Sequence, residues 1–409
     1  MATPAPSADD FLNDPRFNRT FSLPADPSRG RPRDFTIKYA DYGYYNAAHS
    51  DQERVLLFFS PLMGSRLLHI CKDDLARKHR IRIINPDRPG IGGTDGAPAR
   101  DRLALWRDAL PALLAHLQIR RLHAVAAHSG GTVYALDFVL HHPEFLLPCP
   151  LPSPPGATPA STPATATLLA LGAPWILPSH TGSLPLSLAQ HLLPAAAVRQ
   201  ADKLAALVNN HLGPAVGSSI GFAARLMPNR RQYDQEREQG VAGSEEEALE
   251  QHDRGVQFEE QTIWPALMRR VYDEGVAGLG EDAVLFLQKV EGTGTGSGVP
   301  GWGDWGDYDG LVDRLREVLK REEKRLRVRV YYAEKDVVVR DGGAESEGAR
   351  WFDNCWAEGV GGGNADVVDY RSRTVHGADH DHVWDLRWGL VQEVFGQVGQ
   401  VAEEGLNSG

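Results

Sequence analysis

The chain has 409 residues, of which 42% are hydrophobic and 24% are charged, and its net charge at pH 7 is −11. This length can bury a sizeable core in one large domain with an insert or in two domains. The negative charge argues against nucleic acid or an anionic membrane surface as the main partner. No apolar run approaches the roughly 20 residues that a membrane-spanning helix needs.

Two further features of the sequence bear on location. The N-terminal stretch MATPAPSADDFLNDPRF has no basic region followed by an apolar run, so we do not interpret it as a secretory signal. The three cysteines, Cys71, Cys149 and Cys355, lie far apart and are expected to be free thiols in a reducing compartment. We therefore expect a cytoplasmic protein, and the sequence leaves its oligomeric state open.

The first part of the chain alternates short apolar segments with helical ones. Residues 1–33 are rich in Pro, Ala and Asp and are expected to be loosely ordered. Residues 34–43 alternate like an edge strand. The segment 55–60 is continuously apolar, as is typical of a buried parallel strand, and further strands are predicted at 81–87 and 122–127. Helical spacing covers 101–119 and 132–142. This alternation predicts an α/β fold with a doubly wound, mostly parallel sheet.

The middle of the chain departs from this pattern. Residues 147–167 consist almost entirely of Pro, Ala, Ser, Thr and Leu, and we interpret them as a disordered surface loop or as an error in the gene model. Residues 168–174 are typical of one more buried strand. Apolar residues in the stretch 175–300 have helical spacing, which predicts a helical cap inserted into the core. The core is then divided into residues 34–174 and 301–409.

The sheet pattern resumes near the C-terminus. An amphipathic helix is predicted at 311–326 and a strand at 327–336. The last strand and its exit loop are predicted at 366–382. A closing helix is expected over 383–404.

A serine lies between the predicted strand at 122–127 and the helix that follows it. The sequence AHSGG has small residues two positions before and after Ser129, namely Ala127 and Gly131. A serine on a very tight strand-to-helix turn needs such neighbours, because bulky side chains would clash with the strand and the helix. The N–H of Gly130 then lies at a helix start, where it can stabilise an oxyanion. The plainer alternative is a Gly-rich turn with a capping serine.

A nucleophilic serine needs a base, and the base needs an orienting acid. In this architecture the order is Ser, acid, His, each just past a strand end. Asp336 closes one predicted strand, and His380 follows the last one. Glu334 is a weaker candidate for the acid, and His376 and His382 are alternatives for the base.

The same C-terminal cluster also invites a metal interpretation. Its spacing, H-x-x-D-H-D-H over residues 376–382, does not place two histidines on one helical face, and no second ligand cluster stands out. We therefore expect no metal, and a Ser-His-Asp triad needs no other cofactor.

Four motifs in order make the chain resemble an α/β-hydrolase over about 34–146 and 301–404. Besides the serine turn, FFSPLMGSR (58–66) resembles the family's HGxPGSR loop, DRPGIGGT (87–94) its D-R-P-G-x-G-x-S/T turn, and GADH (377–380) its G-x-x-H ending. The resemblance also extends to capped, serine-nucleophile hydrolases of fungi.

The resemblance implies that Ser129 is the nucleophile, Asp336 the acid and His380 the base. It further implies that the N–H groups of Gly130 and Leu62 form the oxyanion hole. In one departure, Ser60-Pro61 replaces the family's His-Gly. Pro61 has no N–H, but the donor would be Leu62, so the hole can survive. In another, Ala127 stands at the first small position. We interpret the DRPGIGGTD turn as structural.

The predicted cap would select the substrate. Apolar candidates for its lining, together with His128 beside the serine, are Trp175, Met227, Trp264 and Met268. The alternative is that these apolar residues pack cap helices together and that His128 is a packing residue behind the site. If some face the site, the substrate is a small molecule with an apolar part.

The leading prediction is a serine hydrolase that cleaves an ester, thioester or related acyl bond through an acyl-enzyme. Acyl transfer or hydrolysis of an activated C–C bond would use the same triad. Epoxide and haloalkane hydrolysis in this fold use an aspartate nucleophile, against which Ser129 argues. A ligand-binding protein with little turnover is the alternative from another class, favoured by the altered Ser60-Pro61 loop and the long insert.

Overall fold

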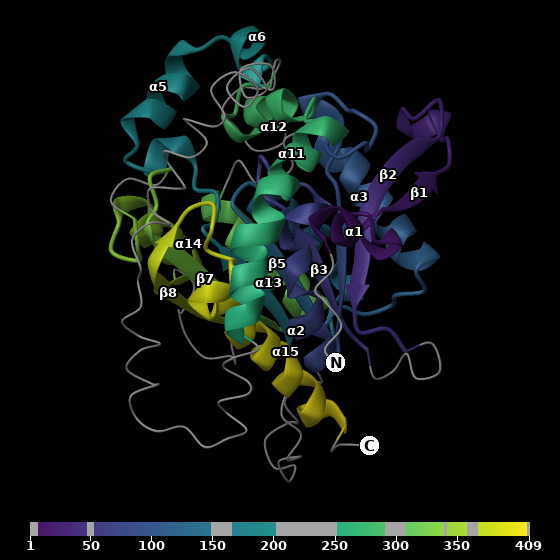
Figure 1. The fold of residues 1–409 in the computed structure, drawn as a ribbon. Helices are drawn as coiled ribbons and strands as arrows, with labels where there is room; N and C mark the ends of the chain where they lie inside the picture. The colour runs from purple at the N-terminus through teal and green to yellow at the C-terminus, as the bar shows by residue number, and fades with distance from the viewer. Residues whose placement is uncertain are drawn as a thin grey trace.

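The computed structural model describes residues 7–46, 53–148, 166–201, 252–290, 308–338, 342–357 and 367–406. These residues form an eight-stranded sheet with helices on both faces (Figure 1). The strands are β1 (Arg19–Leu23), β2 (Phe35–Gly43), β3 (Arg54–Phe59), β4 (Ile81–Pro86), β5 (Ala124–His128), β6 (Thr167–Gly172), β7 (Leu326–Lys335) and β8 (Val368–Asp379). The α-helices are α1 (Ala8–Leu12), α2 (Asp73–Lys78), α3 (Arg102–His116), α4 (Gly131–His141), α5 (Leu184–Leu192), α6 (Ala195–Val198), α11 (Trp264–Glu274), α12 (Leu279–Phe286), α13 (Tyr308–Arg321), α14 (Glu347–Ala357) and α15 (Leu390–Leu406).

The sheet has the strand order β1-β2-β4-β3-β5-β6-β7-β8. Strands β3 to β8 run parallel, whereas β2 is antiparallel to both β1 and β4. The central strands β4, β5 and β6 are buried along their whole length, which explains why their sequences are mostly apolar. Strand β4 also buries the polar residues Arg82 and Asn85. The predicted doubly wound, mostly parallel sheet is confirmed.

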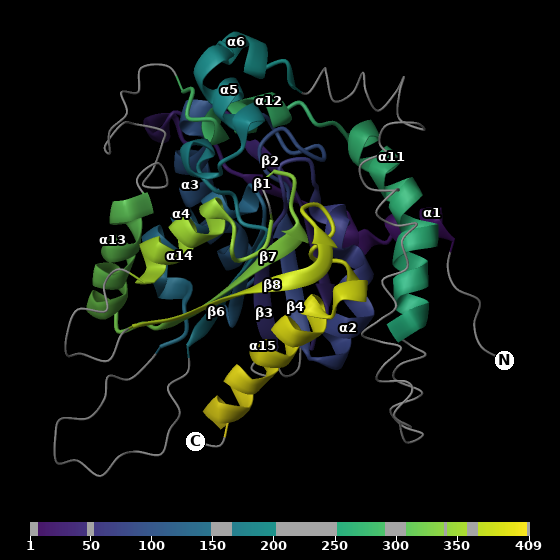
Figure 2. The same cartoon turned by 90° about the vertical axis from the view of Figure 1, so that its left-hand side faces the viewer.

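Two layers of helices cover the sheet. One face packs against α3, α4, α13 and α14 in a core cluster that includes Trp106, Tyr134 and Trp356. The other face packs against α2 and α15 in a second cluster that includes Trp384 and Phe395. Figure 2 shows these helices on opposite sides of the sheet. Because helices cover both faces of the sheet, a site can form at the edge where the carboxyl ends of the parallel strands lie.

The N-terminal segment differs from its prediction. In the described part, β1 pairs with β2 along five residues, Phe17 is fully buried, and Arg16 lies 2.9 Å from Asp73. Loose order over 1–33 is therefore wrong for this part, and β2 is an inner strand rather than an edge strand. Of the five residues of β1 (RTFSL), only Leu23 is buried. The sequence pattern therefore does not predict this strand, which forms by pairing with β2.

Helices make up every regular element in the described parts of 175–300. Figure 1 places α5, α6 and α12 together at the top of the molecule, and α11 lies beside α1. The division into core and cap stays a prediction. Residues 149–165, which hold most of the low-complexity segment and Cys149, lie outside the described residues. No helix in the described residues is both long and apolar enough to cross a membrane.

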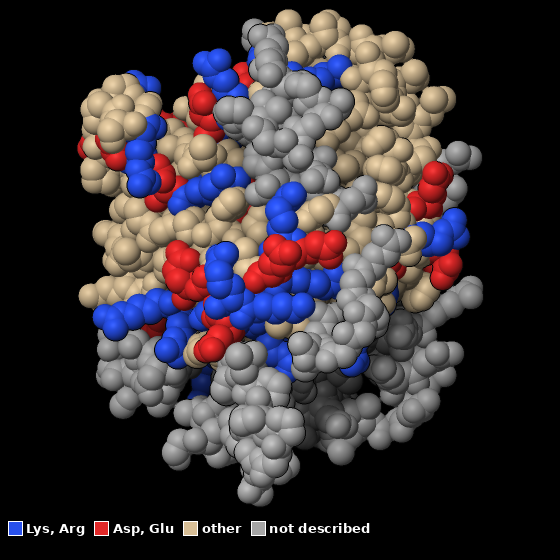
Figure 3. Space-filling model, turned by 180° about the vertical axis from the view of Figure 1, so that it is seen from behind, with Lys and Arg blue, Asp and Glu red and all other residues tan. Residues whose placement is uncertain are grey.

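The surface of α5 is apolar. Leu184, Leu188 and Leu192, spaced four residues apart, are exposed to 68%, 45% and 71%. Residues 173–198 contain no Asp, Glu, Lys or Arg. Figure 3 shows charges of both signs mixed across the back of the molecule and a part at the upper right without charged side chains, where α5 lies.

Candidate active site

Ser129 lies on the turn between β5 and α4. Its φ is 49°, a left-handed conformation that costs a residue with a Cβ atom roughly 1–2 kcal/mol. The turn is also crowded, because a Cβ atom at Gly131 would come within 2.3 Å of the Phe59 carbonyl oxygen. The spacing of small residues around Ser129 therefore has a steric cause in this chain.

The structure brings Ser129, His380 and Asp336 into one chain of hydrogen bonds. His380 Nε2 lies 2.7 Å from Ser129 Oγ, and His380 Nδ1 lies 2.8 Å from Asp336 Oδ2. Asp336 directly follows β7 and His380 directly follows β8, so the carboxyl ends of three parallel strands bring the side chains together. All three residues are buried, with at most 6% of their surface exposed.

The surroundings of His380 favour its protonated form. Burial lowers the pKa of His380, but the carboxylate of Asp336, with smaller contributions from Asp381 and Asp379, raises it, and the net shift is upward. An imidazole whose pKa is raised by a neighbouring carboxylate is a stronger base toward a hydroxyl proton. The arrangement can therefore remove a proton from Ser129 and hold it.

The alternative acids and bases have other partners. Glu334 Oε1 lies 3.1 Å from Nδ1 of the exposed His376. His382 Nδ1 lies 2.6 Å from Asp379 Oδ1. Within the described residues, no group of three His, Cys, Asp or Glu side chains could hold a metal ion.

His128 contacts the backbone of His380. It is fully buried, and its Nε2 lies 2.7 Å from the carbonyl oxygen of His380. Burial, followed by the charge of His380, lowers the pKa of His128 to about 3, so the ring is neutral and Nε2–H donates to that carbonyl. A packing role behind the site therefore describes His128 better than contact with substrate, and its bond to His380 has no signal in the sequence.

The two predicted oxyanion donors lie on different segments. Gly130 is the N-cap residue of α4, so its N–H lies at the positive end of the helix dipole. Leu62 lies on the loop after β3, half-buried against the first core cluster. The carbonyl oxygens of Ser60 and Leu62 both accept hydrogen bonds from the guanidinium of Arg88. The DRPGIGGTD turn, predicted to be structural, thus contacts the loop that carries a predicted donor.

Phe286, at the end of α12, lies directly against the serine turn. A Cβ atom at Gly130 would come within 2.3 Å of Phe286 Cε2. The ring of Phe286 also lies 5.5 Å from that of Trp175. The backbone N–H of Trp175 donates to the Ser129 carbonyl at 3.2 Å. Trp175 was a predicted lining residue, whereas Phe286 was not, because 156 positions separate Gly130 from Phe286 and no local pattern links them.

The other predicted lining residues lie elsewhere. Trp264 and Met268 on α11 pack against the second core cluster, and the Trp264 ring lies 5.0 Å from that of His382. Met227 lies outside the described residues. The structure therefore brings Trp175 to the turn that carries Ser129, and Trp264 close to the loop that carries His380.

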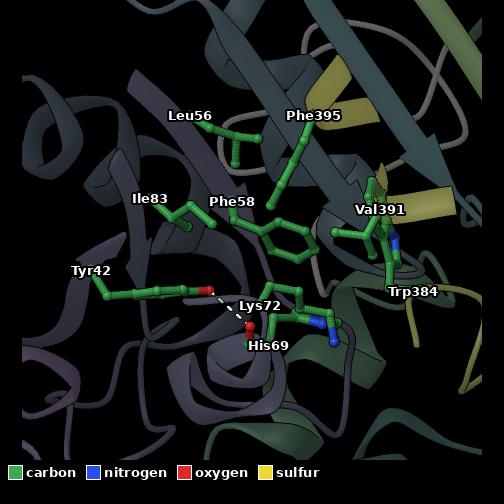
Figure 4. Close-up of a pocket in the computed structure, with 9 residues that line it drawn as sticks. All are labelled: Tyr42, Leu56, Phe58, His69, Lys72, Ile83, Trp384, Val391 and Phe395. Atoms are coloured by element: carbon green, nitrogen blue, oxygen red, sulfur yellow. Dashed lines mark hydrogen bonds between the residues drawn. The ribbon is translucent and has the colours of Figure 1, made fainter. Parts of the chain in front are cut away.

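A small cavity lies behind the site in the second core cluster. It has a volume of about 10 Å³, which is about the size of one water molecule. Figure 4 shows its lining, with His69 and Phe58 at its centre and the Tyr42 hydroxyl donating to the His69 carbonyl at 3.0 Å. His69 lies 5.8 Å, ring to ring, from His128. This cavity is separate from Ser129, His380 and Asp336, which are not among its lining residues.

The strand order and the strained serine after β5 together define the α/β-hydrolase fold. The resemblance drawn from the sequence is confirmed at the level of the fold. No protein-family model and no curated protein matches the sequence.

The chain is similar to several solved structures. One is a carboxylesterase of Nitrososphaera gargenis, at 15% identity and a TM-score of 0.48, with 94% of this chain and 99% of that chain covered. A second is a thermophilic esterase of Thermogutta terrifontis, at 12% identity and a TM-score of 0.46, with 94% of this chain and 99% of that chain covered. A third is an epoxide hydrolase of Vigna radiata, at 12% identity and a TM-score of 0.47, with 94% of this chain and 97% of that chain covered.

Proposed function

We propose that the protein is a serine hydrolase that cleaves an ester, thioester or related acyl bond of a small, partly apolar substrate. The observation that carries the proposal is the chain of hydrogen bonds from Ser129 through His380 to Asp336, at 2.7 and 2.8 Å. The same triad would serve acyl transfer or hydrolysis of an activated C–C bond, in which only the acyl acceptor or the leaving group differs.

The reaction begins when His380 Nε2 takes the proton of Ser129 Oγ as the oxygen attacks the acyl carbon. The negative charge that develops on the acyl oxygen is held by the N–H groups of Gly130 and Leu62. His380 then gives its proton to the leaving group, and the acyl group stays on Ser129. A water molecule, deprotonated by His380, releases the acid. Asp336 holds the ring in the required tautomer and stabilises its charged form.

The apolar part of the substrate is proposed to lie against Trp175 and Phe286, which pack beside the serine turn. Helices α5, α6, α11 and α12 would belong to the cap that encloses it. Ser129 is only 4% exposed, so a substrate must displace part of this cover to reach Oγ.

The test is covalent labelling by a fluorophosphonate probe, which reacts with a serine that its base has activated. We expect the wild-type protein to be labelled and Ser129→Ala and His380→Ala not to be labelled. His376→Ala, which alters an exposed histidine on β8 four residues before His380, serves as the matched control and should be labelled like the wild type. A folded wild-type protein that is not labelled would contradict the proposal and favour ligand binding without turnover.

A further inference from the structure

Arg88 joins three segments that are far apart in the sequence. Its Nη1 donates to the Ser60 carbonyl oxygen, and its Nη2 donates to the Leu62 carbonyl oxygen at 2.8 Å. Its Nε donates to Asp282 Oδ2 at 2.8 Å. The Arg88 side chain is only 1% exposed. One planar guanidinium thus connects the turn after β4, the loop after β3 and helix α12.

Asp282 is the counterion that makes this burial possible. Its carboxylate is fully buried and lies 2.7 Å from Arg102 Nε, and it accepts a hydrogen bond from the Tyr134 hydroxyl at 2.6 Å. Burial raises the pKa of Asp282, but Arg102 and Arg88 outweigh that effect and lower it. The carboxylate is therefore ionised, and it neutralises charge that would otherwise be buried without a partner.

The contacts of Arg88 bear directly on the N–H of Leu62. The Pro61 carbonyl accepts from the Gly64 N–H at 2.9 Å, which fixes the peptide plane on one side of Leu62. Because a trans peptide directs its C=O and N–H in opposite directions, the Leu62 N–H points away from that bond. Arg88 fixes the peptide plane on the other side through the Leu62 carbonyl. Pro61 cannot donate a bond of its own, and Arg88 supplies two of the hydrogen bonds that hold this loop.

We propose that Arg88 is a positioning residue for the oxyanion hole, and that its ion pair with Asp282 makes the position of the Leu62 N–H depend on helix α12. The inference rests on the proposed function of the same site. It assigns to the DRPGIGGTD turn a role in the reaction that acts through the loop rather than by contact with substrate.

Helix α12 contacts the segments of both predicted donors. Asp282 acts on the Leu62 loop through Arg88, and Phe286 lies against Gly130. These two side chains are four residues apart and so lie on the same face of the helix. A shift of α12 would therefore move both halves of the hole together.

The test compares Arg88→Lys with Arg82→Lys. Arg82 lies at the other end of β4 and is similarly buried, with Asp41 and Glu53 as its partners. A lysine keeps the charge but cannot direct three donors in one plane. For p-nitrophenyl butyrate, we expect Arg88→Lys to lower kcat per labelled active site about 10- to 100-fold, with KM and the pH midpoint unchanged. Arg82→Lys should match the wild type in kcat per labelled site.

A second readout reports on the hole itself. An aliphatic trifluoromethyl ketone forms an oxyanion when a serine adds to it, and its Ki can be measured from protection against fluorophosphonate labelling. We expect Arg88→Lys to raise this Ki by the same factor by which it lowers kcat/KM, which is the relation for loss of transition-state stabilisation. A purely structural role would lower the labelled fraction and leave Ki unchanged.

Asp282→Asn keeps the size of the side chain and provides the second variant if Arg88→Lys does not fold. We expect it to raise the Ki of the ketone at least about 5-fold, because the neutral amide no longer holds Arg88 in place. A Ki equal to that of the wild type in whichever of these variants folds would overturn the inference. A wild-type protein that is not labelled would instead overturn the proposed function.

Discussion

At the scale of single residues, the backbone at Ser129 stores strain. Its φ of 49° is imposed by the hydrogen bond from the Ser129 N–H to the Gly172 carbonyl, at 3.1 Å, and by the crowded turn that follows. Strain of this kind persists only where the surrounding structure holds it. The position of the hydroxyl group is therefore obtained at the expense of stability.

This strain can be measured with two variants that both lack the hydroxyl group. Ser129→Gly removes the Cβ atom that makes the left-handed conformation unfavourable, whereas Ser129→Ala retains it. We expect the glycine variant to be more stable than the alanine variant by about 1 kcal/mol, measured by urea unfolding. Equal stabilities would mean that the turn is not strained.

The pKa of His380 offers a second test at this scale. In a Ser129→Ala background the ring should titrate above its ordinary pKa of 6.5, because Asp336 opposes the effect of burial. Adding Asp336→Asn removes the carboxylate that contributes most to raising the pKa of His380. This pKa should therefore be lower in the double variant than in Ser129→Ala alone. NMR titration of the ring protons measures both values. Glu334→Gln is the control and should leave the pKa of His380 nearly unchanged.

At the scale of elements, the contact between α12 and the turn that carries Ser129 depends on one pair of residues, Phe286 and Gly130. Gly130 has ordinary helical angles, so alanine is acceptable to its backbone, and the three atoms nearest to an added Cβ atom all belong to the Phe286 ring. We expect Gly130→Ala to cost at least 1 kcal/mol in the wild type but less in a Phe286→Leu background. A double-mutant cycle of urea unfolding measures this coupling. Strictly additive free energies would show that α12 does not press on the turn.

How much the sequence predicts also differs between elements. Strands β3 to β8 and the residues that follow β5, β7 and β8 could be placed, because β3 to β6 are mostly apolar, β7 alternates, and the carboxyl ends of parallel strands share one edge. Strand β1 could not, since its five residues have little burial of their own. The contacts of Arg88 with Asp282 could not either, because they join residues 194 positions apart.

At the scale of the whole molecule, buried histidines should make stability depend on pH. Burial lowers the pKa of His123 to about 4 and that of His128 to about 3. In the unfolded chain these groups have a pKa near 6.5. The unfolded state therefore binds protons that the folded state does not, and stability falls as the pH drops below 6.5 toward the folded values.

We expect each of these histidines to cost about 2 kcal/mol of stability between pH 7.5 and pH 5. In the wild type, the His123 ring accepts a hydrogen bond from the Val55 N–H at 3.1 Å. His123→Gln can retain an acceptor for this N–H. This variant should lose about 2 kcal/mol less than the wild type over the same interval, measured by urea unfolding. The same loss in both proteins would show that His123 titrates normally in the folded state.

The buried carboxylate of Asp282 also limits how the protein can be redesigned. A helix such as α12, which packs against the turn that carries Ser129, is a natural segment to exchange between proteins of one fold. Here, removing α12 would leave the side chains of Arg88 and Arg102 buried without their shared carboxylate, at a cost of about 3–5 kcal/mol for a broken buried pair. A chimera at residues 279–286 would therefore tolerate a new sequence only if the donor helix brings an acid to the place of Asp282.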